Sequence, residues 1–211
     1  MSKVNSVLGP IDTQNLGFTL MHEHVMSQGF VARDFPELFG PGYQERIIEG
    51  VTEAKNGGVD TIVDATPFDL GRDVSFLAEV SRRTGVNIIA CSGWWMDLPP
   101  YISGQSPDLF AELFVREIET GIADTGIKAG ILKSAADYGG VTPDGEIMLR
   151  AVARAQCRTG VPIILHSYAH EQVARQQLAV LQDEGVDLRK VAVDHVNDTR
   201  DMDYLFWLLE Q

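Results

Sequence analysis

The sequence predicts an α/β fold built from consecutive βα units. Three observations indicate this. Short β-branched runs alternate with longer amphipathic stretches, which is typical of a parallel sheet. The 211 residues are 45% hydrophobic and 22% charged, enough to bury a sizeable core. No linker or shift in composition divides the chain, so we expect one domain covering residues 1–211.

Six short apolar runs predict the strands, and each is followed by a predicted helix. The predicted strands are residues 17–21, 61–65, 87–91, 129–133, 162–165 and 191–194.

The helices have recognisable ends. Asn56-Gly57-Gly58 ends the helix that carries Ile48 and Val51 on one face. Ser106-Pro107 and Thr142-Pro143 each combine an N-cap with proline at the first helical position, and Gly160 is expected to end the second of these helices. A last helix is expected to begin at Asp198 or Thr199, with an inner face formed by Met202, Leu205, Phe206 and Leu209.

Charge and hydropathy exclude several classes of partner. The net charge of -13, without clustered Lys or Arg, argues against nucleic acid. No apolar stretch approaches the roughly 20 residues of a membrane span, and no leader-like segment opens the chain. Cys91 and Cys157 are too few for a disulfide framework. We therefore expect a cytoplasmic protein, away from membranes, that acts on a small molecule.

Four of the five histidines lie where predicted strands end. His22 and His24 flank Glu23, so strand alternation turns both rings to one face, a spacing that suits one metal. A purely structural pair is the alternative. His166 and His195 directly follow two later strands, and parallel α/β folds place their active sites at such ends. His170 falls in a loop and is predicted to be solvated or to support a ligand.

Lys133 ends the fourth predicted strand. Alternation places it opposite to Lys128, so one of the two lysines must point inward. If Lys133 is buried, desolvation favours a neutral amine that can add carbon dioxide. The resulting carbamate can bridge two cations roughly 3.5 to 4 Å apart. The alternative is a strand-end lysine that reaches solvent.

The spread of these residues favours a closed barrel over an open sheet. In the open order 3-2-1-4-5-6, strands 1 and 6 lie about 14 Å apart at about 4.8 Å per spacing, too far for shared metal ligands. In a TIM (β/α)8 barrel the strand ends converge on the axis. Six units cannot close such a barrel, so we expect strands 7 and 8 to be missing at the C-terminus.

Four segments together resemble the phosphotriesterase-like family of the amidohydrolase superfamily, which includes lactonases and phosphotriesterase-related proteins. The resemblance runs from about Gly9 to the C-terminus and rests on "GFTLMHEHV", "GIKAGILKSAAD", "TGVPIILHSYAH" and "VAVDHVNDT".

The resemblance implies a (β/α)8 barrel with a binuclear metal centre. His22 and His24 would bind the more buried metal, and His166 and His195 the more exposed one. Lys133, carboxylated by carbon dioxide, would bridge them. Zinc is expected, and cobalt, manganese or iron would accept the same ligands.

The implied reaction is attack by a metal-bridging hydroxide on a lactone or related ester, with phosphotriesters as promiscuous substrates. Glu23 and Asp64 are candidates for orienting the histidines. The resemblance also implies a homodimer as an expected partner arrangement, since family members often dimerise.

Two features depart from the family pattern. The family's strand-8 aspartate, the sixth ligand and proton acceptor, is expected beyond Gln211. Asp194 is a poor substitute because alternation turns it away from His195. Trp94 and Trp95 replace a family tyrosine and are predicted either to wall the substrate pocket or to pack in the core.

Two other functions remain open. The chain could be a mononuclear amidohydrolase such as a deaminase, which also uses the HxH pair. It could also be a non-catalytic barrel fragment or binding protein.

Overall fold

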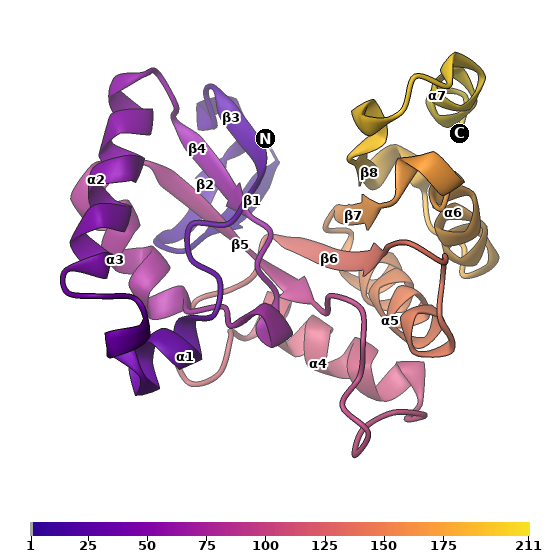
Figure 1. The fold of residues 1–211 in the computed structure, drawn as a ribbon, viewed down its shortest axis with the longest axis horizontal. Coiled ribbons are helices and arrows are strands. Elements are labelled where there is room, and N and C mark those ends of the chain that lie inside the picture. The colour runs from indigo at the N-terminus through magenta and orange to yellow at the C-terminus, as the bar shows by residue number, and fades with distance from the viewer. Residues whose placement is uncertain (1) are drawn as a thin grey trace. The chain divides into compact units, whose positions relative to one another are not determined.

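The computed structural model describes residues 2–211 and divides into two compact units (Figure 1). The first unit extends as far as Ser92 and also includes Arg116–Ile131. The second comprises Gly93–Val115 and Leu132–Gln211. No helix among residues 2–211 combines the length and apolar character needed to cross a membrane.

The first unit begins with an antiparallel hairpin, β1 (Lys3–Ser6) and β2 (Gly9–Asp12), which the sequence did not predict. Three parallel strands follow in the order β3 (Thr19–Glu23), β4 (Thr61–Asp64) and β5 (Asn87–Gly93). The helices between them are α1 (Gly29–Asp34), α2 (Tyr43–Asn56) and α3 (Val74–Thr84).

The second unit holds the parallel strands β6 (Ile131–Ala136), β7 (Ile163–Ser167) and β8 (Val191–Asp194), which alternate with helices. All six side chains of β6 are buried. The helices are α4 (Pro107–Glu119), whose last turn belongs to the first unit, α5 (Pro143–Thr159), α6 (Ala174–Asp183) and α7 (Met202–Leu209).

The predicted helix ends at residues 56, 107, 142 and 160 are confirmed. Thr142 accepts a hydrogen bond from the Gly145 N–H, and Gly160 takes the left-handed conformation (φ 76°) after α5. The strand at residues 191–194 has the predicted boundaries, and the other five predicted strands differ by one to three residues at one or both ends. β3 begins two residues later than predicted, because Gly17 is left-handed (φ 62°). β6 continues to Ala136, which places Lys133 inside the strand.

The prediction for the last helix was wrong in start and face. α7 begins at Met202, because the Asp201 side chain accepts a hydrogen bond from the Tyr204 N–H. Tyr204 is the fully buried side chain, whereas Phe206 and Leu209 are 58% and 84% exposed.

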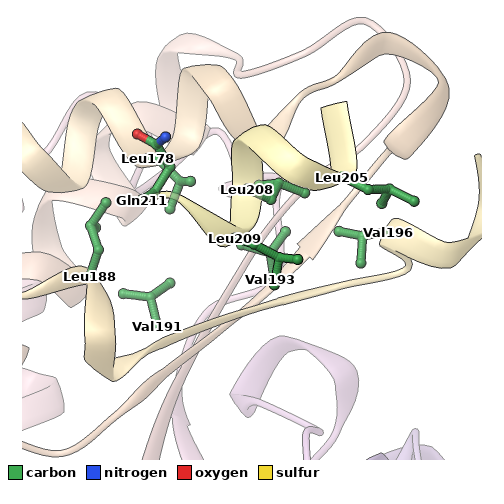
Figure 2. Close-up of a pocket in the computed structure, with 9 residues that line it drawn as sticks. All are labelled: Leu178, Leu188, Val191, Val193, Val196, Leu205, Leu208, Leu209 and Gln211. Atoms are coloured by element: carbon green, nitrogen blue, oxygen red, sulfur yellow. The ribbon is translucent and has the colours of Figure 1, made fainter. Parts of the chain in front are cut away.

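An apolar cavity of about 310 Å³ lies where α7 covers α6 and β8 (Figure 2). Gln211 is its one polar lining residue, so this cavity offers none of the groups that the predicted chemistry requires. Its lining consists of Leu178, Leu188, Val191, Val193, Val196, Leu205, Leu208, Leu209 and Gln211.

Candidate metal centre

The first unit holds the histidine pair of the HxH motif. His22 lies in β3 and His24 directly follows that strand. Their ring centroids are 5.4 Å apart at 62°, as expected for side chains two residues apart on one face of a strand. Glu23 between them is exposed. The structure therefore brings the two rings together within this unit.

Residues after the neighbouring strand β4 hold His24 in place. His24 Nδ1 lies 2.9 Å from Thr66 Oγ1. The carboxylate of Asp64 accepts hydrogen bonds from the N–H groups of Val25 (2.8 Å) and Thr66 (3.0 Å). Asp64 was predicted to orient a histidine. It holds the backbone at Val25, next to His24, and at Thr66, the residue that contacts the His24 ring. Thr66 was not singled out in the sequence, because its contact spans 42 positions.

Asp64 is completely buried. Burial raises its pKa to about 6, although hydrogen bonds from the Thr66 side chain and from the Val25 and Thr66 N–H groups, and the charge of Arg72, oppose this rise. The carboxylate is therefore still ionised at neutral pH and remains an acceptor for these donors.

The second unit buries Lys133 completely, while Lys128 in the first unit is exposed. This confirms that Lys133 is the lysine that points inward. Its Nζ lies 3.9 Å from Asp194 Oδ2 and 5.7 Å from the centroid of the Trp95 ring. A buried amine beside one carboxylate and an indole lies in the dry surroundings that the carbamate chemistry requires.

Gly93 lets the chain pass close to Lys133. Its φ is +113°, and a Cβ at this position would lie 2.0 Å from the Lys133 carbonyl oxygen. The next residue, Trp94, donates its N–H to that same oxygen at 3.1 Å. A side chain at position 93 is therefore excluded, and the loop that carries Trp95 is held against β6.

His166 and His195 lie together in the second unit. Their ring centroids are 4.5 Å apart. The centroid of the Trp95 ring also lies 4.5 Å from that of His166. His195 is left-handed (φ 63°), an unusual conformation for a residue other than glycine that is often found at functional sites.

This left-handed turn corrects the prediction for Asp194. Strand alternation was expected to point Asp194 away from the metal ligands. Because the strand ends at Asp194 and the chain turns at His195, regular alternation no longer applies. Asp194 lies beside Lys133, and His195 lies beside His166. Both side chains therefore belong to the cluster of candidate ligands in the second unit.

The pKa of His166 is lowered to about 4, first by burial and then by the nearby His195 and Lys133. Asp137, whose Oδ2 lies 3.5 Å from His166 Nε2, opposes this shift. At neutral pH the ring is therefore uncharged, so the contact with Asp137 is no ion pair. A neutral imidazole is the form that binds metals.

The remaining predicted residues lie in different surroundings. Trp94 is buried and donates its indole N–H to the Asp97 carbonyl at 2.9 Å, a contact typical of a packing residue. Trp95 is half-buried and contacts His166. His170 is exposed, and its ring lies 5.5 Å from Tyr168.

These donors fit a divalent metal in their chemistry. Within residues 2–211, no three His, Cys, Asp or Glu side chains converge closely enough to hold a cation by themselves. Lysine is outside that set of residue types. A carbamate on Lys133 would add two oxygens beside the neutral imidazole of His166, and mixed nitrogen and oxygen donors suit zinc and its neighbours.

Comparison with known proteins decides the family. The model of the family described as "Phosphotriesterase family" matches residues 2–211. The chain belongs to the phosphotriesterase family. The resemblance inferred from the four sequence segments is thereby confirmed.

Individual members of the phosphotriesterase family support this assignment. The chain is 42% identical over 219 residues to the phosphotriesterase homology protein of Mycobacterium tuberculosis, covering 97% of this chain and 67% of the relative. It is also 42% identical over 200 residues to the aryldialkylphosphatase of Saccharolobus solfataricus, covering 92% and 63%. The chain thus spans about two thirds of the length of these relatives.

A solved structure supports the fold. The structure of the phosphotriesterase from Mycobacterium tuberculosis matches with a TM-score of 0.93 at 42% identity, covering 99% of this chain and 68% of that one. This confirms the predicted fold class, an α/β fold that corresponds to six βα units of a TIM barrel. The metal ligands and substrate contacts remain predictions.

Proposed function

We propose that the chain supplies the metal-binding part of a metal-dependent hydrolase that opens a lactone or a related ester. The observation that carries the proposal is the group formed in the second unit by buried Lys133 and the rings of His166 and His195. Membership of the phosphotriesterase family supports it.

The assignment of ligands follows the family resemblance. His22 and His24 bind one divalent cation, His166 and His195 bind another, and Lys133 contributes a carbamate formed with carbon dioxide. Zinc is the first choice, and cobalt, manganese or iron suit the same donors. When bound, the cations supply a Lewis acid for the substrate oxygen and lower the pKa of a water molecule.

The chain's own side chains prepare this chemistry. The surroundings of His166 keep its ring neutral, so no proton has to be removed before it binds a cation at neutral pH. Trp95 packs against the ring of His166 and lies 5.7 Å from Lys133 Nζ. The same indole offers an apolar wall to the substrate.

The substrate class has two candidates. The lactone assignment rests on the resemblance to the lactonase members of the family. The name of the aryldialkylphosphatase from Saccharolobus solfataricus supports phosphotriesters as a second class of substrate for this chain. Both reactions place developing negative charge on an oxygen that a cation stabilises.

The test combines metal analysis with activity. The full chain is loaded with zinc, cobalt or manganese in the presence of bicarbonate, and bound metal is counted by mass spectrometry. Hydrolysis of short- and long-chain lactones is compared with that of a nitrophenyl dialkyl phosphotriester.

We expect two metals per chain and faster turnover of lactones. One metal per chain would overturn the binuclear assignment and favour a deaminase-like site. Two bound metals without hydrolysis of either class would favour a binding protein, and turnover of phosphotriesters alone would overturn the lactone assignment.

A further inference from the structure

His24 needs a hydrogen-bond partner that decides which ring nitrogen faces a cation. The ring is exposed in the first unit, so packing alone does not hold its orientation. Thr66 is completely buried beside it, and its Oγ1 lies 2.9 Å from Nδ1. This contact joins the end of β3 to the end of β4.

The direction of this hydrogen bond follows from a count of protons. A threonine hydroxyl has one proton to donate and two lone pairs that accept. Both oxygens of Asp64 already accept backbone N–H groups, from Thr66 at 3.0 Å and Val25 at 2.8 Å, so Asp64 acts as an acceptor. Towards its side-chain partner, the Thr66 hydroxyl, a carboxylate can only accept a proton. The Thr66 oxygen is therefore left to accept a proton, and His24 Nδ1–H is the donor at hydrogen-bonding distance.

Backbone hydrogen bonds hold the side chains of Asp64, Thr66 and His24 next to one another. Asp64 accepts the N–H groups of both Val25 and Thr66, so one carboxylate holds the residue after His24 and the residue that contacts its ring. The Ala65 N–H also donates to the Glu23 carbonyl at 2.8 Å. The two strand ends are thus joined on either side of the His24 ring.

We propose that Thr66 is a positioning residue that accepts the Nδ1 proton of His24 and thereby leaves the lone pair of Nε2 for a divalent cation. The Asp64–Thr66–His24 chain of hydrogen bonds sets the tautomer and the orientation of the ring. The part that concerns the cation rests on the proposed function. The tautomer itself does not.

The first test measures the tautomer in the metal-free chain. Nitrogen-15 NMR of the His24 ring, assigned by comparison with His24→Asn, reports which nitrogen carries the proton. We expect the proton on Nδ1 in the native chain and in Thr66→Ser, which keeps the hydroxyl. Thr66→Val, which keeps the volume, should give a mixture of tautomers. A native His24 protonated on Nε2 would overturn the proposal without any variant.

The second test measures zinc affinity by competition with a chelator. Thr66→Val should weaken binding about 10- to 100-fold, the usual effect of losing a partner of a metal ligand, while Thr66→Ser stays close to the native affinity. Thr52→Val is the matched control in the same unit, because the Thr52 hydroxyl donates only to the Ile48 carbonyl of α2. Equal zinc affinity of Thr66→Val and Thr66→Ser would overturn the proposal.

The outcomes separate this proposal from the hydrolase assignment. A native chain that binds no zinc would contradict the proposed function, while the NMR experiment would still test the tautomer. A native chain that binds zinc but shows no difference between the two Thr66 variants would contradict the role of Thr66 alone.

Discussion

The two histidine pairs of this chain are built in different ways. His22 lies in β3 and His24 directly follows it, so their proximity comes from one short extended segment of the chain. His166 and His195 come from the neighbouring strands β7 and β8, and the left-handed turn at His195 brings the rings within 4.5 Å.

The surroundings of the pairs differ as well. His24 is exposed and is held through Thr66. His166 is packed against Trp95 and its pKa is lowered to about 4. The comparison teaches that a motif of three residues can bring two candidate ligands together, but a buried and neutral ligand requires packing between strands.

The largest expected effect concerns Lys133, the completely buried lysine of the second unit. Lys133→Met should lower kcat/KM more than about 100-fold, since even indirect partners of metal ligands are worth about 10- to 100-fold. Metal content should fall in parallel, measured by mass spectrometry. Lys128→Met is the exposed control and should leave both values unchanged. Full metal content in Lys133→Met would show that metal binding by the two histidine pairs does not require this lysine.

The close approach at Gly93 gives the next largest effect. Gly93→Ala should lower the free energy of unfolding by more than about 2 kcal/mol, because a Cβ meets the Lys133 backbone and φ is positive. Gly104→Ala, with φ +75° and no atom within 4 Å, should cost only about 1 kcal/mol of backbone strain. Urea unfolding measures both. Equal losses would show that the loop after β5 moves freely away from β6.

Substitution of Trp95 tests whether the residues packed around His166 also form part of the substrate pocket. Trp95→Ala should raise KM for a lactone about 10-fold, because an aromatic contact is worth about 0.5 to 1.5 kcal/mol beyond its burial. Trp95→Phe should recover most of the loss. Steady-state kinetics separate KM from kcat. A fall in kcat at constant KM would instead indicate that Trp95 acts only through His166 and Lys133.

The smallest effect concerns the pH dependence of stability. The pKa of His166 is lowered from 6.5 to about 4 in the folded chain, so the unfolded chain binds more protons between these values. In metal-free protein the free energy of unfolding should therefore fall as pH drops from 6.5 towards 4.

The control for this prediction removes the titrating ring. His166→Asn should flatten the dependence, as measured by urea unfolding at several pH values. If the free energy of unfolding of His166→Asn depends on pH as steeply as that of the native chain, other groups cause the dependence. The lowered pKa of His166 would then no longer distinguish the two histidine pairs.

Much of the fold was predictable because its signals are local. The caps at Thr142 and Gly160 depend on residues within one helical turn, and the structure confirms both. The start of the last helix was missed because Asp198, Thr199 and Asp201 are all acceptable caps in the sequence, whereas in the structure Asp201 caps the helix through the Tyr204 N–H. The hairpin β1–β2 was missed because its short strands carry little apolar alternation.

The sequence by itself determined the order and types of the candidate ligands, the choice between Lys128 and Lys133 as the inward lysine, and the family to which they point. These features follow from residue chemistry and from the two-residue repeat of a strand. Tertiary structure decided the contact between His24 and Thr66, the burial of Lys133, the placement of Asp194 beside Lys133 and of His195 beside His166, and the lowered pKa of His166. The physical reason is that desolvation and contacts between strands arise only when residues far apart in sequence pack together.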